Sequence, residues 1–205
     1  MPDPLHAQAP AKINLVLEVL GRRPDGYHEI DTILQTLDLA DQVTLGFGLE
    51  TGVVTSGPYA AGTPTDESNL AWRAAAELAQ RSGESTDGLQ IRLEKHIPPA
   101  GGLGGGASDA AATLRLLQQH WPGVTDDMVG QAANAIGSDE AFFLRGHTAR
   151  ARGRGEQITI LPALHRHGVV LFSPYGSIER KTPRMFAALD GLPFDDGGVA
   201  AAFAA

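Results

Sequence analysis

The sequence has 205 residues, a net charge of −8 and a hydrophobic fraction of 42%, which is ordinary for a globular protein. It contains no cysteine, which excludes disulfide bonds, thiolate metal ligands and thiol catalysis. The acidic balance opposes nucleic-acid binding, since that function needs a basic surface. The first residues lack the apolar core of a signal peptide, and no apolar run reaches the roughly 18 residues of a membrane span. We therefore expect a soluble cytoplasmic protein with no nucleic-acid and no membrane partner.

Alternating side chains predict β-structure near the N-terminus. Residues 11–20 alternate between apolar and polar side chains, so Lys12 and Asn14 share one face of the expected strand, about 6.6 Å apart. An Asp25-Gly26 turn follows. Sequence rich in β-branched residues then predicts two more strands, and a run of glycine, proline and threonine predicts a loop. These two strands and the loop cover residues 30–39, 41–48 and 51–66.

Helices and further strands follow in irregular order. One helix is expected between a glycine-rich stretch and Trp121, and three others over residues 69–82, 125–137 and 182–190. Strands are expected over residues 88–95, 148–161 and 167–172. Because strands and helices are mixed without regular alternation, the pattern favours the α+β class over a doubly wound sheet.

The stretch PPAGGLGGGASD, residues 98–109, holds five glycines just before a predicted helix. Glycine lets backbone N–H groups approach an anion closely, and a helix start adds unpaired N–H groups. The alternative is a flexible surface loop. Neither the dinucleotide motif nor the Walker motif fits, because Ala107 stands where these require glycine or lysine.

The glycine-rich stretch resembles the second motif of the GHMP kinases. Residues 9–41 and 137–156 are also similar to segments of that family, and the resemblance extends over residues 9–190. It implies an ATP- and Mg²⁺-dependent kinase with a ribosomal-protein-like N-terminal domain over residues 1–154. Residues 155–205 would begin a ferredoxin-like C-terminal domain that is incomplete, because the family's third glycine-rich motif lies further downstream. We accordingly expect weak ATP binding, poor turnover and self-association.

The resemblance implies that the glycine loop wraps the phosphates of ATP. Many family members carry serines, one of them a magnesium ligand, where this chain has Gly105 and Gly106, so the metal ligands stay unassigned. The implied nucleotide-binding residues are Asn69, Pro99, Ala100, Gly101, Gly102, Leu103, Gly104, Gly105, Gly106, Ala107, Ser108 and Asp109.

The resemblance also implies that Lys12 and Asp139 are the catalytic pair. Asp139 would accept the proton of the acceptor hydroxyl, while Lys12 would stabilise the developing alkoxide. Without the resemblance, Lys12 reads as a solvated lysine on an outer strand face, and Asp139 as the N-cap of a helix.

The acceptor implied by the most similar branch of the family is a small molecule, a cytidine-diphosphate-linked methylerythritol. Its 2-hydroxyl would be phosphorylated in the non-mevalonate isoprenoid pathway. Tyr27 and Phe186 would stack on the cytosine, and His28 would bind its edge; without the resemblance, Tyr27 and His28 read as half-buried loop anchors. The implied substrate-binding residues are Asn14, Tyr27, His28, Thr182 and Phe186.

Two other functions stay open at this point. One is a GHMP kinase for homoserine or mevalonate, and the other is a non-catalytic nucleic-acid-binding module. Only the arginine-rich residues 145–156 favour the module, and their alternation also fits a strand with its arginines in water.

Overall fold

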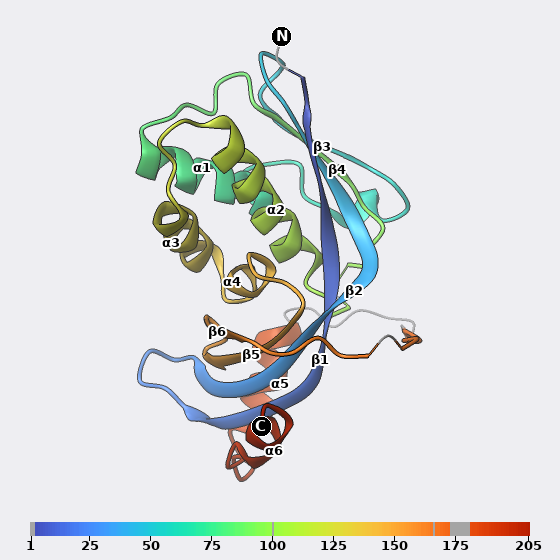
Figure 1. Ribbon diagram of the computed structural model, residues 1–205, viewed down its shortest axis with the longest axis vertical. Coiled ribbons are helices and arrows are strands. Elements are labelled where there is room, and N and C mark those ends of the chain that lie inside the picture. The colour runs from blue at the N-terminus through green and yellow to red at the C-terminus, as the bar shows by residue number, and fades with distance from the viewer. Residues whose placement is uncertain (1–2, 100, 166, 173–180) are drawn as a thin grey trace.

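The longest feature of the molecule is an antiparallel hairpin of two strands (Figure 1). Strand β1 (Leu5–Arg22) pairs with β2 (His28–Gly46) along almost its whole length, and the chain reverses at the expected Asp25-Gly26 turn, where Gly26 has a φ of 86°. Three register shifts interrupt the pairing, so the strict alternation expected for residues 11–20 is broken by bulges. The computed structural model describes residues 3–99, 101–165, 167–172 and 181–205, except the side chains of residues 181–183.

The other strands extend the sheet from the free edge of β2. Strands β4 (Gln90–Glu94) and β5 (Thr148–Gly153) pair with opposite halves of β2, both antiparallel. Strand β3 (Gly52–Ser56) then pairs with β4 in parallel, and β6 (Gln157–Ile160) pairs with β5. Strands β4 and β5 thus pair with separate parts of β2, and residues 36–41 between them pair with neither strand. Residues 36–38 and 40 lie near α2, with which they line a common cavity.

The expectation of two strands over residues 30–39 and 41–48 is wrong, because β2 is a single strand of 19 residues. The second of the expected strands was to begin at Asp41. Asp41 is instead fully buried and paired with Lys95. A partner 54 residues away removes the cost of burying this carboxylate, so the strand continues.

Three more expectations for strands need correction. Residues 51–66 were expected to be a loop, but parallel pairing with β4 makes residues 52–56 a strand. The single strand expected over residues 148–161 is a hairpin of β5 and β6, turned at Gly153 and Gly155. Residues 167–172 form no strand in the described part of the chain, and Val170 and Phe172 are there 95% and 89% exposed.

The four predicted helices are confirmed. Asn69 and Thr125 cap the first and third helices through their side chains, and Gly83 ends the first in the left-handed conformation. Two short helices, over residues 139–143 and 198–203, and a 3-10 turn were not among the predicted elements. The helical elements are η1 (Ala60–Gly62), α1 (Leu70–Ser82), α2 (Gly105–His120), α3 (Asp126–Ile136), α4 (Asp139–Phe143), α5 (Lys181–Leu189) and α6 (Gly198–Phe203).

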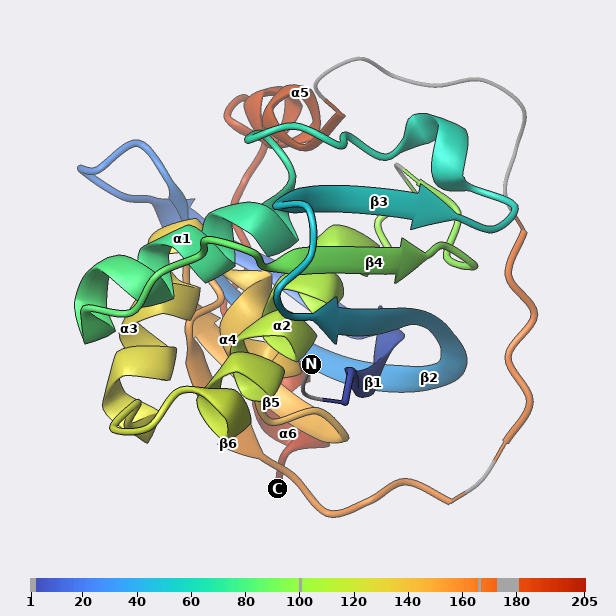
Figure 2. The same ribbon diagram turned by 90° about the horizontal axis from the view of Figure 1, so that it is seen from above.

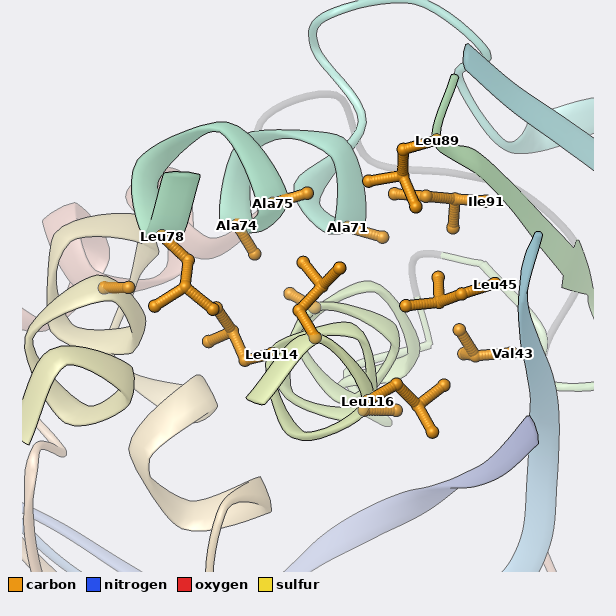
Figure 3. Close-up of a cluster of buried hydrophobic side chains, with 14 of the residues drawn as sticks. Val43, Leu45, Ala71, Ala74, Ala75, Leu78, Leu89, Ile91, Leu114 and Leu116 are labelled. Carbon is orange, nitrogen blue, oxygen red and sulfur yellow. The ribbon is translucent and has the colours of Figure 1, made fainter. Parts of the chain in front are cut away.

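Helix α2 lies at the centre of the core, between the sheet and α1 (Figures 2 and 3). Its Leu114 lies next to Leu78 of α1, and Leu116 lies on the side of the strand residue Val43, all within one cluster of buried residues. Its opposite side, with Ala107 and Ala111, packs on Phe142 and Phe143 in a second cluster. Alanine suits a helix buried on both sides, because small side chains allow close approach.

The mixed order of elements confirms the α+β class. None of the described helices is long and apolar enough to cross a membrane. Helix α6 is fastened to β1 by Glu18, whose carboxylate accepts hydrogen bonds from Val199 N (3.3 Å) and Ala200 N (2.7 Å).

Candidate active site

The glycine loop connects β4 to the start of α2. Gly102 and Gly104 have φ values of 76° and 73°, the left-handed region that glycine enters without strain. Gly104 is the N-cap of α2 and contributes no side-chain hydrogen bond to it. The first N–H groups of α2 are therefore not capped by a side chain, which leaves them available to an anion.

Packing also leaves little room for a side chain at three of the five glycines. A Cβ on Gly104 would lie 2.7 Å from Cζ of Phe143, and one on Gly105 would lie 3.2 Å from Cγ2 of Ile97. A Cβ on Gly106 would lie 3.3 Å from Cδ1 of Leu70. Gly101, Gly102 and Gly106 are exposed, whereas Gly104 and Gly105 are partly buried. The loop thus combines a closely packed helix start with an open backbone segment.

Lys12 and Asp139 lie together beside this helix start. Lys12 N donates to the carbonyl oxygen of Leu103 at 2.9 Å, which ties β1 to the glycine loop. Lys12 Nζ lies 3.6 Å from Oδ2 of Asp139. The lysine side chain is 9% exposed and the aspartate side chain 43%, so Lys12 is not the solvated lysine that the strand pattern alone suggests.

Asn14 holds Lys12 in this position. Lys12 Nζ donates to Oδ1 of Asn14 at 2.8 Å, so the expected common face of these two residues is confirmed. Asn14 Nδ2 in turn donates to Oγ1 of Thr32 at 2.8 Å. Asp139 is the first residue of α4, and Ser138 is its N-cap. The N-cap role considered for Asp139 is therefore wrong. Its carboxylate instead faces the ammonium group of Lys12.

A buried charged cluster lies behind the glycine loop and was not predicted from the sequence. Lys95 Nζ donates to both Asp41 and Asp109, and all three residues are at most 5% exposed. Asp41 also accepts a 2.8 Å hydrogen bond from Ile97 N, which fixes the start of the loop. Burial raises the pKa of Asp109 to about 7, against the opposing attraction of Lys95. The signal in the sequence was a lysine directly after a buried strand.

The other residues expected to bind nucleotide differ in accessibility. Ser108 is buried, and its Oγ has no partner among the described residues. Ala107 is buried in the second cluster, Pro99 is exposed, and Ala100 lies outside the described residues. Asn69 is 4% exposed and caps α1, accepting from Ala71 N at 2.9 Å. Its side chain is thus already engaged within the fold.

Three of the residues expected on the substrate side, Tyr27, His28 and Phe186, lie at the turn of the β1–β2 hairpin. His28 stacks on Phe186 with ring centroids 4.8 Å apart, and its Nε2 lies 2.8 Å from Oδ1 of Asp190. Tyr27 is 52% exposed, with the guanidinium of Arg154 5.2 Å above its ring. Phe186 therefore stacks on His28 in this structure, and its expected stacking on the cytosine, opposite Tyr27, stays a prediction. The side chain of Thr182 lies outside the described part.

Comparison with known proteins relates the chain to a protein family. Residues 69–147 match the family model described as the GHMP kinases N terminal domain. The chain has the fold of the GHMP kinases. A 4-diphosphocytidyl-2-C-methyl-D-erythritol kinase of Saccharopolyspora erythraea is 42% identical over 199 residues, which are 94% of this chain and 61% of that protein. A protein of the same name from Brevibacillus brevis is 44% identical over 193 residues, which are 94% of this chain and 65% of that protein.

Solved structures of GHMP kinases agree with the fold. A crystal structure of a 4-(cytidine 5'-diphospho)-2C-methyl-D-erythritol kinase has a TM-score of 0.62 and 41% identity, covering 77% of this chain and 56% of that one. A homoserine kinase from Cytophaga hutchinsonii has a TM-score of 0.56 at 17% identity, covering 94% and 67%, and this likeness concerns the fold alone. The chain spans less than two thirds of the length of the curated relatives named above.

Proposed function

We propose that this chain is a GHMP kinase that transfers the γ-phosphoryl group of ATP to the 2-hydroxyl of 4-diphosphocytidyl-2-C-methyl-D-erythritol, a step of the non-mevalonate isoprenoid pathway. The observation that carries the proposal is the Lys12–Asp139 pair, 3.6 Å apart, beside a helix start that no side chain caps. Relatives of that name, more than 40% identical, support the choice of acceptor. We also propose a cytoplasmic location.

In this proposal the backbone of the glycine loop and the first turn of α2 hold the phosphates of ATP. The exposed backbone of Gly101 and Gly102 fits such a ligand, because bulky side chains would obstruct its approach. Magnesium, bound with the nucleotide, would neutralise phosphate charge. Within the described residues, no group of three or more histidine or acidic side chains is arranged to hold a metal ion, so we assign it no protein ligand.

Asp139 and Lys12 then handle the acceptor hydroxyl. The half-exposed carboxylate of Asp139 takes the proton, and the buried ammonium of Lys12 orients that carboxylate and stabilises the oxygen that attacks phosphorus. Because Asn14 and the Leu103 carbonyl fix Lys12, the ammonium is in place before the substrate arrives.

We assign the cytidine end of the substrate to the hairpin turn, with Tyr27 stacking on the base and His28, Phe186 and Thr182 around it. The exposed ring of Tyr27 supports this assignment. The division into domains at residues 1–154 and 155–205 also stays a proposal.

A panel of acceptors tests the function. ATP consumption should follow addition of the cytidylyl substrate, and should stay at background with homoserine or mevalonate. The Asp139→Asn variant, which should not transfer the phosphoryl group, measures the background ATP consumption. Equal or faster turnover with homoserine or mevalonate would overturn the assignment of the acceptor. Competition by CMP against the acceptor provides a second readout, because the proposed turn site recognises the cytidine end.

A further inference from the structure

A cavity of about 460 Å³ lies beside α2, apart from the Lys12–Asp139 pair. Its walls come from the first half of β1, the segment of β2 around residues 36–40, α2, and the connection from α4 to β5. Neither Lys12, Asp139 nor any glycine of residues 101–106 lines it. Phe143 does line it, and the same ring packs against Gly104. The cavity therefore lies behind the glycine loop and not in its open mouth.

Two guanidinium groups meet at this cavity. Arg115 of α2 and Arg145 both line it, and burial together with the charge of Arg145 lowers the pKa of Arg115. Among the described residues, no carboxylate lies within 4.0 Å of either guanidinium. Asp38 lines the cavity too but forms no ion pair with them. Placing two cations together without counter-charge is costly, and it is unexpected in a chain of net charge −8.

The rim of the cavity is held in an unusual backbone conformation. His147 has a φ of 62° and is the one non-glycine residue with positive φ in the described part of the chain. Its carbonyl oxygen accepts from Thr36 N at 3.0 Å, and Gly146 N donates to the Phe142 carbonyl at 2.7 Å. Arg115 donates one of its five N–H groups to the Leu144 carbonyl, which leaves the others free to bind. Strained residues that are fastened in this way cluster at ligand sites.

A neighbouring cavity of about 350 Å³ shares Arg115 and Arg145 but adds Asp126 and Glu156. Those two carboxylates would repel an anion more than the single carboxylate of the larger cavity, Asp38, would. The larger cavity instead adds His147 and the buried, unpartnered hydroxyl of Ser108. The two guanidinium groups thus favour an anion on the side of the larger cavity.

We propose that the larger cavity binds a small phosphorylated metabolite, with its phosphoryl group between Arg115 and Arg145 and the imidazole of His147 as a further donor. Planar guanidinium groups match phosphoryl oxygens in paired hydrogen bonds. The volume lies within the range of small-molecule sites, about 300–1,000 Å³. The rest of the ligand would lie against Phe143 and the apolar face of Ala112. This site is independent of the proposed kinase reaction.

Amide chemical shifts of the ¹⁵N-labelled chain test the proposal. The probes are glycerol 3-phosphate and inorganic phosphate, titrated without magnesium and with saturating ADP to occupy the proposed nucleotide loop. We expect saturable shifts at residues 145–147, with glycerol 3-phosphate binding more tightly than inorganic phosphate. Arg115→Gln with Arg145→Gln should raise the Kd by about tenfold or more, because each charge-assisted hydrogen bond is lost. Arg81→Gln with Arg92→Gln removes the same charge elsewhere and should leave the Kd within about twofold.

Several results would overturn the proposal. These are equal Kd values in the Arg115/Arg145 and Arg81/Arg92 double variants, no saturable shifts at residues 145–147 in the presence of ADP, or binding of inorganic phosphate with exclusion of glycerol 3-phosphate. If the Arg115/Arg145 variant fails to fold by circular dichroism, Arg145→Gln alone decides. The Arg145 guanidinium makes no hydrogen bond with a described residue, so that variant keeps the internal contacts.

Discussion

Lys12 shows how a charged side chain is prepared for chemistry inside a fold. Its ammonium is nearly removed from water, and it is compensated by Asn14 Oδ1 at 2.8 Å and by Asp139 at 3.6 Å. A buried charge needs such partners, since burial without them costs several kcal/mol. The pair with Asn14 follows from strand periodicity. Asp139 lies 127 residues further along the chain, and only the family resemblance connected the two.

Loss of either member of the pair should remove turnover while sparing ATP. Asp139→Asn and Lys12→Met should each lower kcat by about 10²- to 10⁴-fold, the usual range for acid–base catalysis. Because the two act on one proton transfer, the double variant should lose less than the product of the single losses. ATP affinity, measured by calorimetry, should be nearly unchanged. Full activity of Asp139→Asn would contradict the general-base role.

Glu140, next to the catalytic aspartate, should make stability depend on pH. Burial first, and the charge of Asp139 second, raise the pKa of Glu140 from 4.5 to about 7. Between these values the folded chain keeps a proton that the unfolded chain releases, so the unfolding free energy falls as pH rises. The loss is up to about 3 kcal/mol.

Glu140→Gln has no proton to release. Urea unfolding of both proteins at pH 5 and pH 8 should therefore show a wild-type stability that declines relative to the variant. A difference that stays constant between the two pH values would count against a raised pKa for Glu140.

At the scale of elements, the sequence predicts helices better than strands. Helices α1 and α3 carry local signals at both ends, namely a capping side chain at Asn69 or Thr125 and a terminal glycine. Strand β3 carries little signal beyond Val53 and Val54, and it forms because β4 is available as a partner. The continuity of β2 through the buried Asp41 likewise depends on a distant partner, Lys95. Strand formation depends on partner strands that are distant in the sequence, and the local sequence of a strand does not reveal these partners.

The glycine loop should tolerate a methyl group at one glycine and not at another. Gly104→Ala places a Cβ 2.7 Å from the ring of Phe143 at a φ of 73°, so we expect a loss of roughly 1–3 kcal/mol in stability and much weaker ATP binding. Gly101→Ala adds only ordinary contacts at 3.5 Å and serves as the control for stability. Thermal unfolding and nucleotide titration of both variants measure the contrast. Equal stability of the two variants would contradict a packing role for Gly104.

Asn69 should matter first as the cap of α1. Its Oδ1 accepts from Ala71 N at 2.9 Å, and its Nδ2 donates to the Pro64 carbonyl at 2.6 Å. Asn69→Ala should cost about 1–2 kcal/mol in unfolding free energy. Asn69→Asp keeps the cap acceptor and should retain more of the stability than the alanine variant. If both variants keep full stability in chemical denaturation, the cap is not important.

At the scale of the whole molecule, the β1–β2 hairpin connects two proposed binding regions. Its middle carries Lys12 beside the glycine loop, and its turn carries Tyr27 and His28 (Figure 1). Helix α5 reaches this turn through the stacked rings of His28 and Phe186. The family resemblance predicted that Tyr27, His28 and Phe186 belong to one site. It did not predict their contacts, in which Phe186 stacks on His28 and Arg154 lies over Tyr27. Ring pairing depends on tertiary placement, which periodicity does not encode.

The position of Tyr27 predicts that binding of the two nucleotides can be separated by mutation. Tyr27 is half exposed at the hairpin turn, whereas Tyr59 precedes η1, whose Gly62 packs near Pro99 of the glycine loop. Tyr27→Ala should weaken the cytidylyl substrate by about 1–3 kcal/mol, the range for a stacked base, and leave ATP affinity nearly unchanged. Tyr59→Ala removes an equal ring and should leave the cytidylyl substrate unaffected. Calorimetric titration of each variant with each nucleotide measures all four values. Weaker ATP binding in Tyr27→Ala, with intact binding of the cytidylyl substrate, would mean that the hairpin turn receives the phosphate donor instead.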